Sequence, residues 1–183
     1  MPRAHRFVPA FAFLATLLAT SIAAPAARAA GFTVVPAETT VTVGDTFTLR
    51  VTCDAVPDLK GFQVALHFPA ARLQFVAMPA GELLTDPPGD WFATLLPDVT
   101  APADTAWLDA ARLDGSVAGP GVLAYLTLKA LTTGDAALTC VWAEMRDSNN
   151  VPLAPGCAAA LVHVVGPVPT VRRSWGALKP QRR

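Results

Sequence analysis

Short runs of alternating apolar and polar residues, separated by Gly, Pro and Asp, most constrain how this chain folds. From Thr46 to Cys53 the apolar residues fall at every second position, and the pattern returns from Phe62 to Phe68. A period of two places all the apolar side chains on one face of a β-strand. No segment beyond residue 30 keeps a helical period. The pattern therefore predicts an all-β domain whose sheets bury their apolar faces against each other.

The strand signals recur at the turn spacing that is typical of β-sandwiches, and they predict about nine strands. Gly121 to Leu131 is the strongest late strand, because apolar residues lie on both of its faces. A single helical turn fits only residues 70–72 or 79–84, and neither is long enough to change the fold class. Further predicted strands span residues 32–35, 41–43, 73–78, 91–96, 106–113, 138–145 and 158–165.

The amino terminus has the pattern of a secretory signal peptide. Arg3, His5 and Arg6 precede an apolar run, and small residues follow at positions 27 and 29 in an A-x-A pattern. We expect cleavage after Ala29, so that residues 1–29 are removed and the mature form has no membrane span. A membrane anchor is the alternative, because the apolar run approaches the ~20 residues that cross a bilayer. The 183 residues less these 29 leave 154, which suits one domain.

Charge is distributed unevenly between the predicted domain, residues 30–166, and the segment that follows it. The domain holds all fourteen acidic side chains of the chain and six basic ones, a formal charge of −8. Nucleic-acid binding depends on a basic surface, so we expect no nucleic-acid partner. Residues 167–183 contain five basic side chains and no carboxylate.

Residues 167–183 form a predicted proline-containing linker and a basic tail. The alternation of Pro167 and Pro169 indicates a stiff, extended connection that ends the domain. Ser174 to Lys179 is similar to a short Trp-Gly-x-x-Lys tail at the ends of some secreted bacterial proteins. A sorting or docking peptide and a disordered, solubilising end are both consistent with this sequence.

Three cysteines, Cys53, Cys140 and Cys157, allow one disulfide and one free thiol in an exported protein. Cys140 and Cys157 are the favoured pair because they are closest in sequence and flank a turn-rich segment. Cys53 lies on an apolar strand face and competes with them. Beyond residue 29 the only histidines are His67 and His163, too few for a zinc site with these cysteines. We expect no metal and no cofactor.

The segment Asp147-Ser148-Asn149-Asn150 has oxygen-bearing side chains at alternate positions, as at the start of a calcium loop. The Gly at the sixth place and the Glu at the twelfth place of such a loop are absent. Asn and Asp also favour tight turns, so the segment predicts a turn.

Catalytic patterns are weak, and we expect no enzyme. Ser116, Ser148 and Ser174 lie outside any G-x-S-x-G elbow. His67 has no acid nearby in sequence to orient it as a base. Paired carboxylates could serve glycoside hydrolysis, but these acids stand beside turn residues, where Asp is favoured for turn geometry: Asp86, Asp90, Asp98, Asp104, Asp109 and Asp114.

Tryptophans indicate a possible sugar-binding surface. Trp91, Trp107 and Trp142 would stack on sugar rings if they lay on one flat face. With Leu108 and Ala110 pointing inward, strand alternation places Trp107 and Asp109 outward. A carbohydrate-binding module is therefore an alternative to a protein-binding one.

The sequence resembles cohesin domains along most of its length, from Val41 to Val165. The segment LKGFQVALHFPAARLQF, residues 59–75, resembles the cohesin strand that is followed by a Pro-Ala-Arg-Leu corner. Further similar features are Val43-Gly44-Asp45-Thr46, the strand opening at Gly121, and the turn after Arg146. The resemblance implies a nine-stranded jelly-roll β-sandwich, related to bacterial carbohydrate-binding modules.

The resemblance also implies a function. Cohesins capture dockerin modules of secreted enzymes through one sheet face, so we expect a secreted, non-catalytic module that binds a dockerin-bearing or other secreted protein. Extracellular polysaccharide degradation is the implied setting. A polysaccharide ligand, or a structural role at the cell surface or in a matrix, is the alternative. The expected binding face comprises Gln63, His67, Trp91, Trp107, Asp109 and Trp142.

Overall fold

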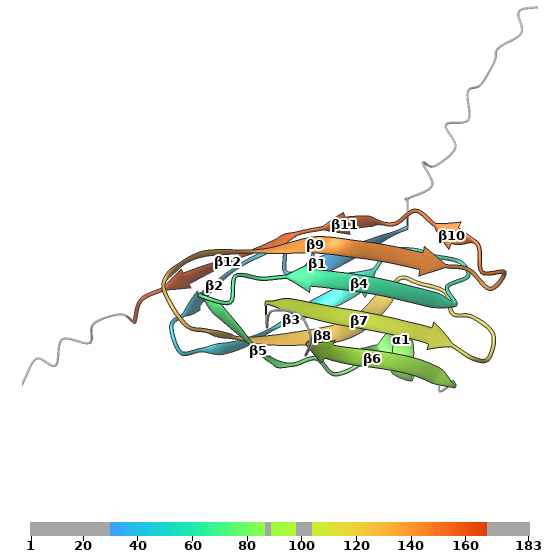
Figure 1. Ribbon diagram of the computed structural model, residues 1–183, viewed down its shortest axis with the longest axis horizontal. Helices are drawn as coiled ribbons and strands as arrows, with labels where there is room; N and C mark the ends of the chain where they lie inside the picture. The colour runs from blue at the N-terminus through green and yellow to red at the C-terminus, as the bar shows by residue number, and fades with distance from the viewer. Residues whose placement is uncertain (1–29, 87–88, 98–103, 168–183) are drawn as a thin grey trace, which may run out of the picture.

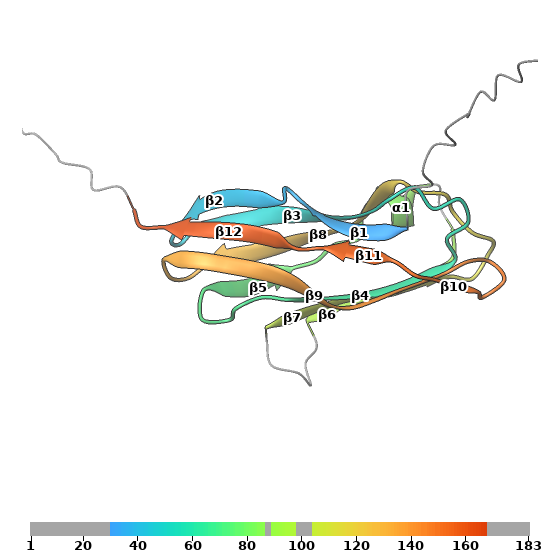
Figure 2. The ribbon, with the colours of Figure 1, turned by 90° about the horizontal axis from the view of Figure 1, so that it is seen from above.

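Two β-sheets packed face to face make up the domain (Figures 1 and 2). The computed structural model describes residues 30–86, 89–97 and 104–167. The predicted signal peptide, residues 1–29, and the basic tail beyond residue 167 lie outside the described residues. The one described helix, α1 (Glu82–Thr85), is four residues long. The all-β prediction is confirmed. Among the described residues, no helix has the length and apolar character needed to cross a bilayer.

The smaller sheet has five strands in the order β11-β1-β3-β8-β5. Their bounds are β1 (Gly31–Val35), β3 (Thr46–Cys53), β5 (Leu73–Ala77), β8 (Gly121–Ala130) and β11 (Gly156–Ala158).

The larger sheet has seven strands in the order β2-β12-β9-β4-β7-β6, with β10 paired to β9. Their bounds are β2 (Glu38–Thr42), β4 (Gly61–His67), β6 (Trp91–Pro97), β7 (Thr105–Arg112), β9 (Gly134–Arg146), β10 (Pro152–Leu153) and β12 (Ala160–Val165).

The described residues form twelve strands, where the sequence predicted about nine by turn spacing. The added strands lie near the carboxyl end, where β10 was not predicted and β11 is separate from β12. The first segment, predicted as two strands, changes sheet between β1 and β2, at Pro36 and Ala37, and the last changes sheet at Ala159. For β3, inside the domain, the alternation of apolar and polar residues predicted the observed bounds, residues 46–53.

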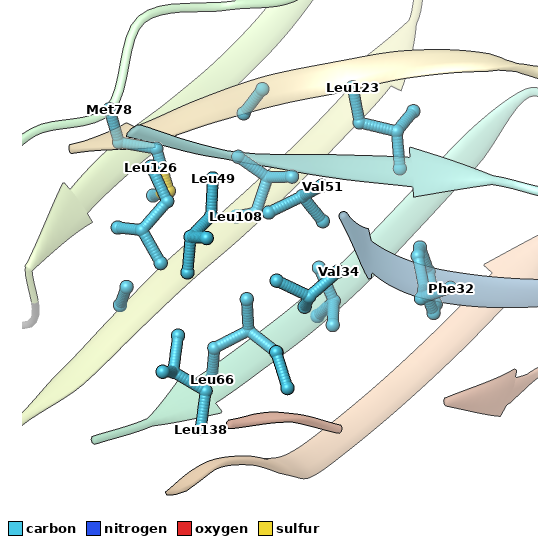
Figure 3. Packing of buried hydrophobic residues seen from close by; sticks show 14 of the residues in the cluster. Phe32, Val34, Leu49, Val51, Leu66, Met78, Leu108, Leu123, Leu126 and Leu138 are labelled. Carbon is cyan, nitrogen blue, oxygen red and sulfur yellow. The ribbon is translucent and has the colours of Figure 1, made fainter. Parts of the chain in front are cut away.

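The core fills the space between the sheets with the inward side chains of both (Figure 3). Phe62, Val64 and Leu66 of β4 are each at most 4% exposed, and Leu49 and Val51 of β3 at most 1%. Burying one such side chain stabilises the fold by roughly 1.5–3 kcal/mol. This burial fixes which face of each strand points inward, and so which face is left for binding.

The first and last strands run parallel to each other in both sheets. In the smaller sheet β1 pairs with β11, with Phe32 opposite Cys157. In the larger sheet β2 pairs with β12, with Thr40 opposite His163. Both chain segments therefore cross from one sheet to the other at the same edge of the sandwich.

A disulfide lies at this shared edge. Cys140 of β9 is bonded to Cys157 of β11, with their Cα atoms 6.1 Å apart, so the bond joins the larger sheet to the smaller. Cys53 is a free cysteine in the core, and burial raises the pKa of its thiol.

Removing this disulfide is expected to destabilise the domain. The cysteines are 17 residues apart, close to the 15-residue loop for which chain entropy predicts about 3 kcal/mol. Cys140→Ala with Cys157→Ala should lower the free energy of unfolding by about that amount in urea titrations. Reductant should shift the unfolding midpoint of the natural chain but not that of the double variant. A natural chain insensitive to reductant would contradict the role of the bond.

His163 bridges three strands of the larger sheet on its solvent side. Its Nδ1 lies 2.7 Å from Asp135 Oδ1 on β9, and its Nε2 lies 2.7 Å from Glu38 Oε1 on β2. The hydrogen bonds to Asp135 and then to Glu38 raise the pKa of the His163 imidazole. The charged imidazolium therefore stabilises the edge where β2 and β12 meet.

This bridge makes stability depend on pH. Because folding raises the pKa of His163, the stabilisation is fully present below its unfolded pKa of about 6.5. It is lost as pH rises through the raised, folded-state pKa. As the pH rises through this range, the thermal unfolding midpoint of the natural chain should fall relative to the midpoint of the His163→Gln variant. The difference should be small, because solvent screens these exposed groups. Equal pH profiles for the two chains would refute the bridge.

Candidate partner-binding face

Four adjacent strands, β9-β4-β7-β6, present a continuous outward surface, here called the outer face. Since Phe62, Val64 and Leu66 point into the core, alternation turns Gln63, Ala65 and His67 outward on β4. The same parity on β7 turns Trp107 and Asp109 outward, because Ala106, Leu108 and Ala110 are buried. The cross-strand register then places these residues in rows.

One row is polar. Gln63 lies opposite Asp109 of β7 on one side and opposite Glu144 of β9 on the other. Thr94 of β6 lies opposite Asp109 and continues the row. Two carboxylates thus flank one amide in the middle of the face.

The next row is aromatic. Ala65 lies opposite Trp107 on one side and Trp142 on the other. Ala65 is fully buried although it points away from the core. A register shift beside Ala65 inserts Val141 as an extra residue in β9, and Val141 and Trp142 are both about half exposed. Two strand spacings separate the tryptophan backbones by about 10 Å.

A hollow of about 210 Å³ opens at Gly61, which has no side chain to cover the strands there. Ala111 lies opposite Gly61, so the floor is made of small groups. The hollow is lined by Gly61, Phe62, Gln63, Asp109, Ala110, Ala111, Glu144 and Arg146. The outer face therefore combines apolar projections with a polar-rimmed depression.

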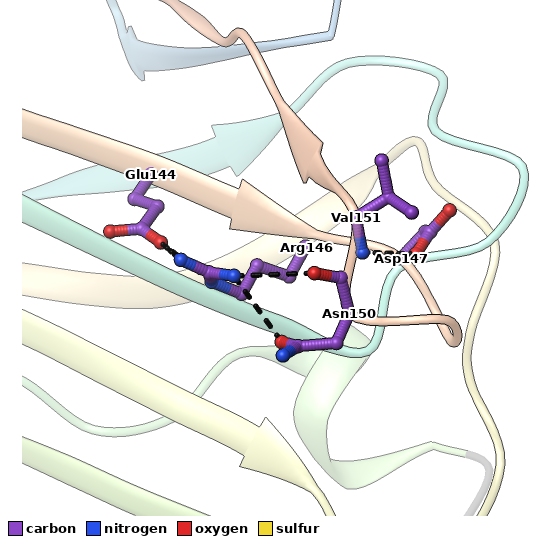
Figure 4. Close-up of polar contacts among 5 residues, drawn as sticks. All are labelled: Glu144, Arg146, Asp147, Asn150 and Val151. Carbon is purple, nitrogen blue, oxygen red and sulfur yellow. Dashed lines mark hydrogen bonds and ion pairs between the residues drawn. The ribbon is translucent and has the colours of Figure 1, made fainter.

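The rim on the β9 side is held by an ion pair (Figure 4). Arg146 Nε donates to Glu144 Oε1 at 2.6 Å, and Arg146 Nη1 donates to the backbone oxygen of Asn150 at 3.2 Å. These contacts hold the guanidinium beside the hollow.

The turn after β9 uses Asp147 as a structural residue. Its Oδ1 accepts the backbone N–H of Asn149 at 2.9 Å and that of Val151 at 2.8 Å. Asn150 has a φ of 62°, a left-handed conformation that Asn tolerates. The segment forms the predicted turn. Among the described residues, no group of three or more His, Cys, Asp or Glu side chains is arranged to hold a metal ion.

His67 has an acidic partner that the sequence did not indicate. Its Nε2 lies 3.4 Å from Asp104 Oδ2, and Thr105 donates a hydrogen bond to the other carboxylate oxygen at 3.0 Å. His67 stands at the end of β4, on the outer face beyond the aromatic row. It borders the hydrophobic part of the face.

Trp91 does not lie on the outer face, which corrects its predicted placement. Trp91 lies opposite Arg112 of β7, and Arg112 is on the same face of β7 as the buried Ala110. Trp91 therefore points toward the core. Its ring packs against the core, and the Arg112 guanidinium carbon lies 5.8 Å from the ring centroid. The neighbouring Phe92, 63% exposed, takes the outward position instead.

The register brings together five of the six predicted residues, all except Trp91. It also adds Phe92, Val141, Glu144 and Arg146, which the sequence analysis did not select. Glu144 and Arg146 follow Trp142 at intervals of two, so strand alternation was a usable signal for them.

The comparisons with known proteins agree with this geometry. The family model described as a cohesin domain matches residues 32–151. The chain belongs to the cohesin family. Among curated proteins, no match was found.

Solved cohesin structures share the fold. A non-cellulosomal cohesin from the hyperthermophilic archaeon Archaeoglobus fulgidus is 14% identical, with a TM-score of 0.61 over 75% of this chain and 92% of that one. A type I cohesin from Clostridium thermocellum, solved in complex with a dockerin, is 16% identical, with a TM-score of 0.63 over 79% and 99%. The seventh ScaB type I cohesin of Pseudobacteroides cellulosolvens is 14% identical, with a TM-score of 0.63 over 80% and 98%. These likenesses establish the cohesin sandwich.

Proposed function

We propose that this cohesin is an exported, non-catalytic module that binds a dockerin-type or other secreted protein on its outer face. The observation that carries the proposal is the mixed surface of β9-β4-β7-β6. Exposed Phe92, Val141 and Trp142 lie on the same four strands as Asp109 and Glu144. Aromatic anchors with polar neighbours are typical of protein interfaces.

Arg146 adds to the protein-binding character of this face. Arginine and tryptophan are enriched among the residues that dominate binding energy. Arg146 is oriented by Glu144 before any partner binds, so little conformational entropy is lost when its remaining N–H groups find acceptors. The hollow beside it is a place for a protruding partner side chain.

Export and setting are part of the proposal. Residues 1–29 act as a signal peptide, residues 30–166 form the binding domain, and residues 167–183 form the linker and tail. The Cys140–Cys157 disulfide supports an oxidising, extracellular location. Cohesins solved with dockerins support a dockerin partner. The proposed setting is extracellular polysaccharide degradation.

Capture of secreted proteins from the source organism tests the proposal, with the immobilised chain and with or without calcium. We expect retention of a dockerin-bearing protein, and Gly61→Leu should weaken it about tenfold or more by filling the centre of the face. A Cβ at Gly61 would meet its nearest atoms, the Ala110 oxygen and Ala111 Cβ, at 3.5 and 3.7 Å, which are ordinary contacts. The fold should therefore persist in circular dichroism.

Gly156→Leu is the matched control. Gly156 lies on β11 of the smaller sheet, and a Cβ there meets nothing within 4 Å. Equal binding by the two glycine variants would show that the partner does not use the outer face. Retention of no protein at all would remove the protein-binding proposal.

Carbohydrate binding is the second candidate, favoured by the row in which Trp107 and Trp142 flank Ala65. Two indole rings on one side of a sheet offer stacking positions for sugar rings. Trp107→Ala with Trp142→Ala should abolish retention on insoluble polysaccharide if this function holds, while Trp91→Ala, off the outer face, should not. If the natural chain does not bind polysaccharide in this pull-down assay, the second candidate fails.

A further inference from the structure

β2 forms one edge of the larger sheet and, among the described strands, pairs with β12 alone. Figure 2 shows it at the margin of the sandwich, beside β12. An edge strand presents unpaired N–H and C=O groups to which another strand can bind. Which residues of β2 present them follows from the bonds at its two ends, because backbone groups alternate in direction along a strand.

The odd-numbered residues of this segment direct their backbone groups toward β12. Just before the strand, the Ala37 oxygen accepts the N–H of Leu161 at 2.9 Å. Just after it, the N–H of Val43 donates to the Val165 oxygen, also at 2.9 Å. The even-numbered residues between them therefore face the free edge.

The open stretch of this edge is formed by Glu38 and Thr40. Thr42 also faces the free edge, but the turn that follows uses both of its backbone groups. Its N–H donates to Asp45 Oδ2 at 3.0 Å, and its oxygen accepts the N–H of Asp45 at 3.0 Å. Glu38 and Thr40 thus leave two N–H and two C=O groups directed away from β12.

A carboxylate stands at each end of the open stretch. Glu38 has a side chain that is 70% exposed. Asp45 is exposed too, and its carboxylate lies at the free edge itself, because it accepts the N–H of Thr42. Asp135, which contacts the same His163 as Glu38, is likewise 70% exposed. A strand that complements this edge is therefore basic.

We propose that Arg172, Arg173 and Ser174 of the chain's own tail add a short strand to this edge, opposite Thr40. The two arginines then lie between the carboxylates of Asp45 and Glu38. The tail has the required charge, because residues 167–183 contain five basic side chains and no carboxylate.

The direction of the added strand follows from where the chain leaves the sheet. β2 and β12 are parallel, and Thr42 lies opposite Val165, the last residue of β12. A chain that leaves Val165 is therefore at the Thr42 end of β2. It runs back along the free edge toward Glu38, antiparallel to β2.

The tail is long enough for this path. The position opposite Thr40 lies about 10 Å across from β12, two strand spacings, and about 7 Å back from Val165 along the strands. A path that passes over the end of β2 with about 5 Å of clearance is roughly 22 Å long. Seven to nine residues beyond Val165 span about 22–28 Å at the ~3.1 Å per residue of an extended, Pro-containing segment. Arg172 to Ser174 are the residues that this length brings to Thr40.

The linker before these residues favours the pairing. Pro167 and Pro169 precede the added strand, so their missing N–H groups remove none of its hydrogen bonds. A short tether also gives the tail a millimolar effective concentration at the edge, so a weak contact is enough to hold it there. Trp175 follows toward the exposed Pro36 and Ala37, where the chain passes from β1 to β2.

Amide hydrogen exchange on the chain that includes residues 167–183 tests the pairing. Arg172→Glu with Arg173→Glu reverses the charge of the added strand, and Arg182→Glu with Arg183→Glu makes the same change beyond Pro180. We expect the Thr40 amide to exchange about tenfold more slowly in the natural chain and in the 182/183 variant than in the 172/173 variant, as for a docked state populated ten to one. All four substitutions lie outside the sandwich.

The Val41 amide is the internal reference, because this odd-numbered residue is already directed toward β12. Its exchange should be the same in all three chains. Equal exchange of the Thr40 amide in the three chains would overturn the proposal. Equally fast exchange in both variants would also overturn it, because the total charge of the tail, rather than the position of the two arginines, would then be responsible.

Protection of Thr40 that grows with protein concentration would assign the pairing to the tail of a second copy, and would overturn the intramolecular form. None of these results depends on the function proposed for the outer face. β12 separates β2 from that face, and no partner protein is present in the measurement.

Discussion

The pairing of the first strand with the last, in both sheets, is the interaction on which the rest of this cohesin depends. β1 with β11 and β2 with β12 close one edge of the sandwich, and the Cys140–Cys157 bond joins the sheets there. The strands between these termini can then stack their apolar faces across the core. On the opposite side, β5 and β6 form the sheet edges, and β6 borders the outer face.

The outer face owes its shape to small residues as much as to large ones. Gly61 and Ala111 leave the hollow, and the small Ala65 stands between Trp107 and Trp142 in the register. The extra residue in β9 turns Val141 outward as well as Trp142. A flat sheet thereby gains both a depression and a ridge, which shape-dependent recognition of a protein requires.

The orientation of Trp91 could not be predicted from the alternation of apolar and polar residues. Trp91 and Phe92 are adjacent aromatic residues, so the sequence pattern allows either one to face inward, and only the register with β7 decides that Trp91 does. The contact of His67 with Asp104 likewise joins two strand ends that are far apart in sequence. Gln63 and Asp109 were placed correctly, because each stands between residues whose burial is unambiguous.

The sequence by itself determined the all-β class, the inward and outward faces of the strands with clear alternation, and the acidic charge of the domain. These properties depend on a period of two and on composition, which are local. Only the tertiary structure decided the rows of the outer face, the hollow at Gly61, the division of the first and last strands, and the position of Trp91. These depend on cross-strand register, which is set by the summed packing of residues distant in sequence and is not encoded in any one segment.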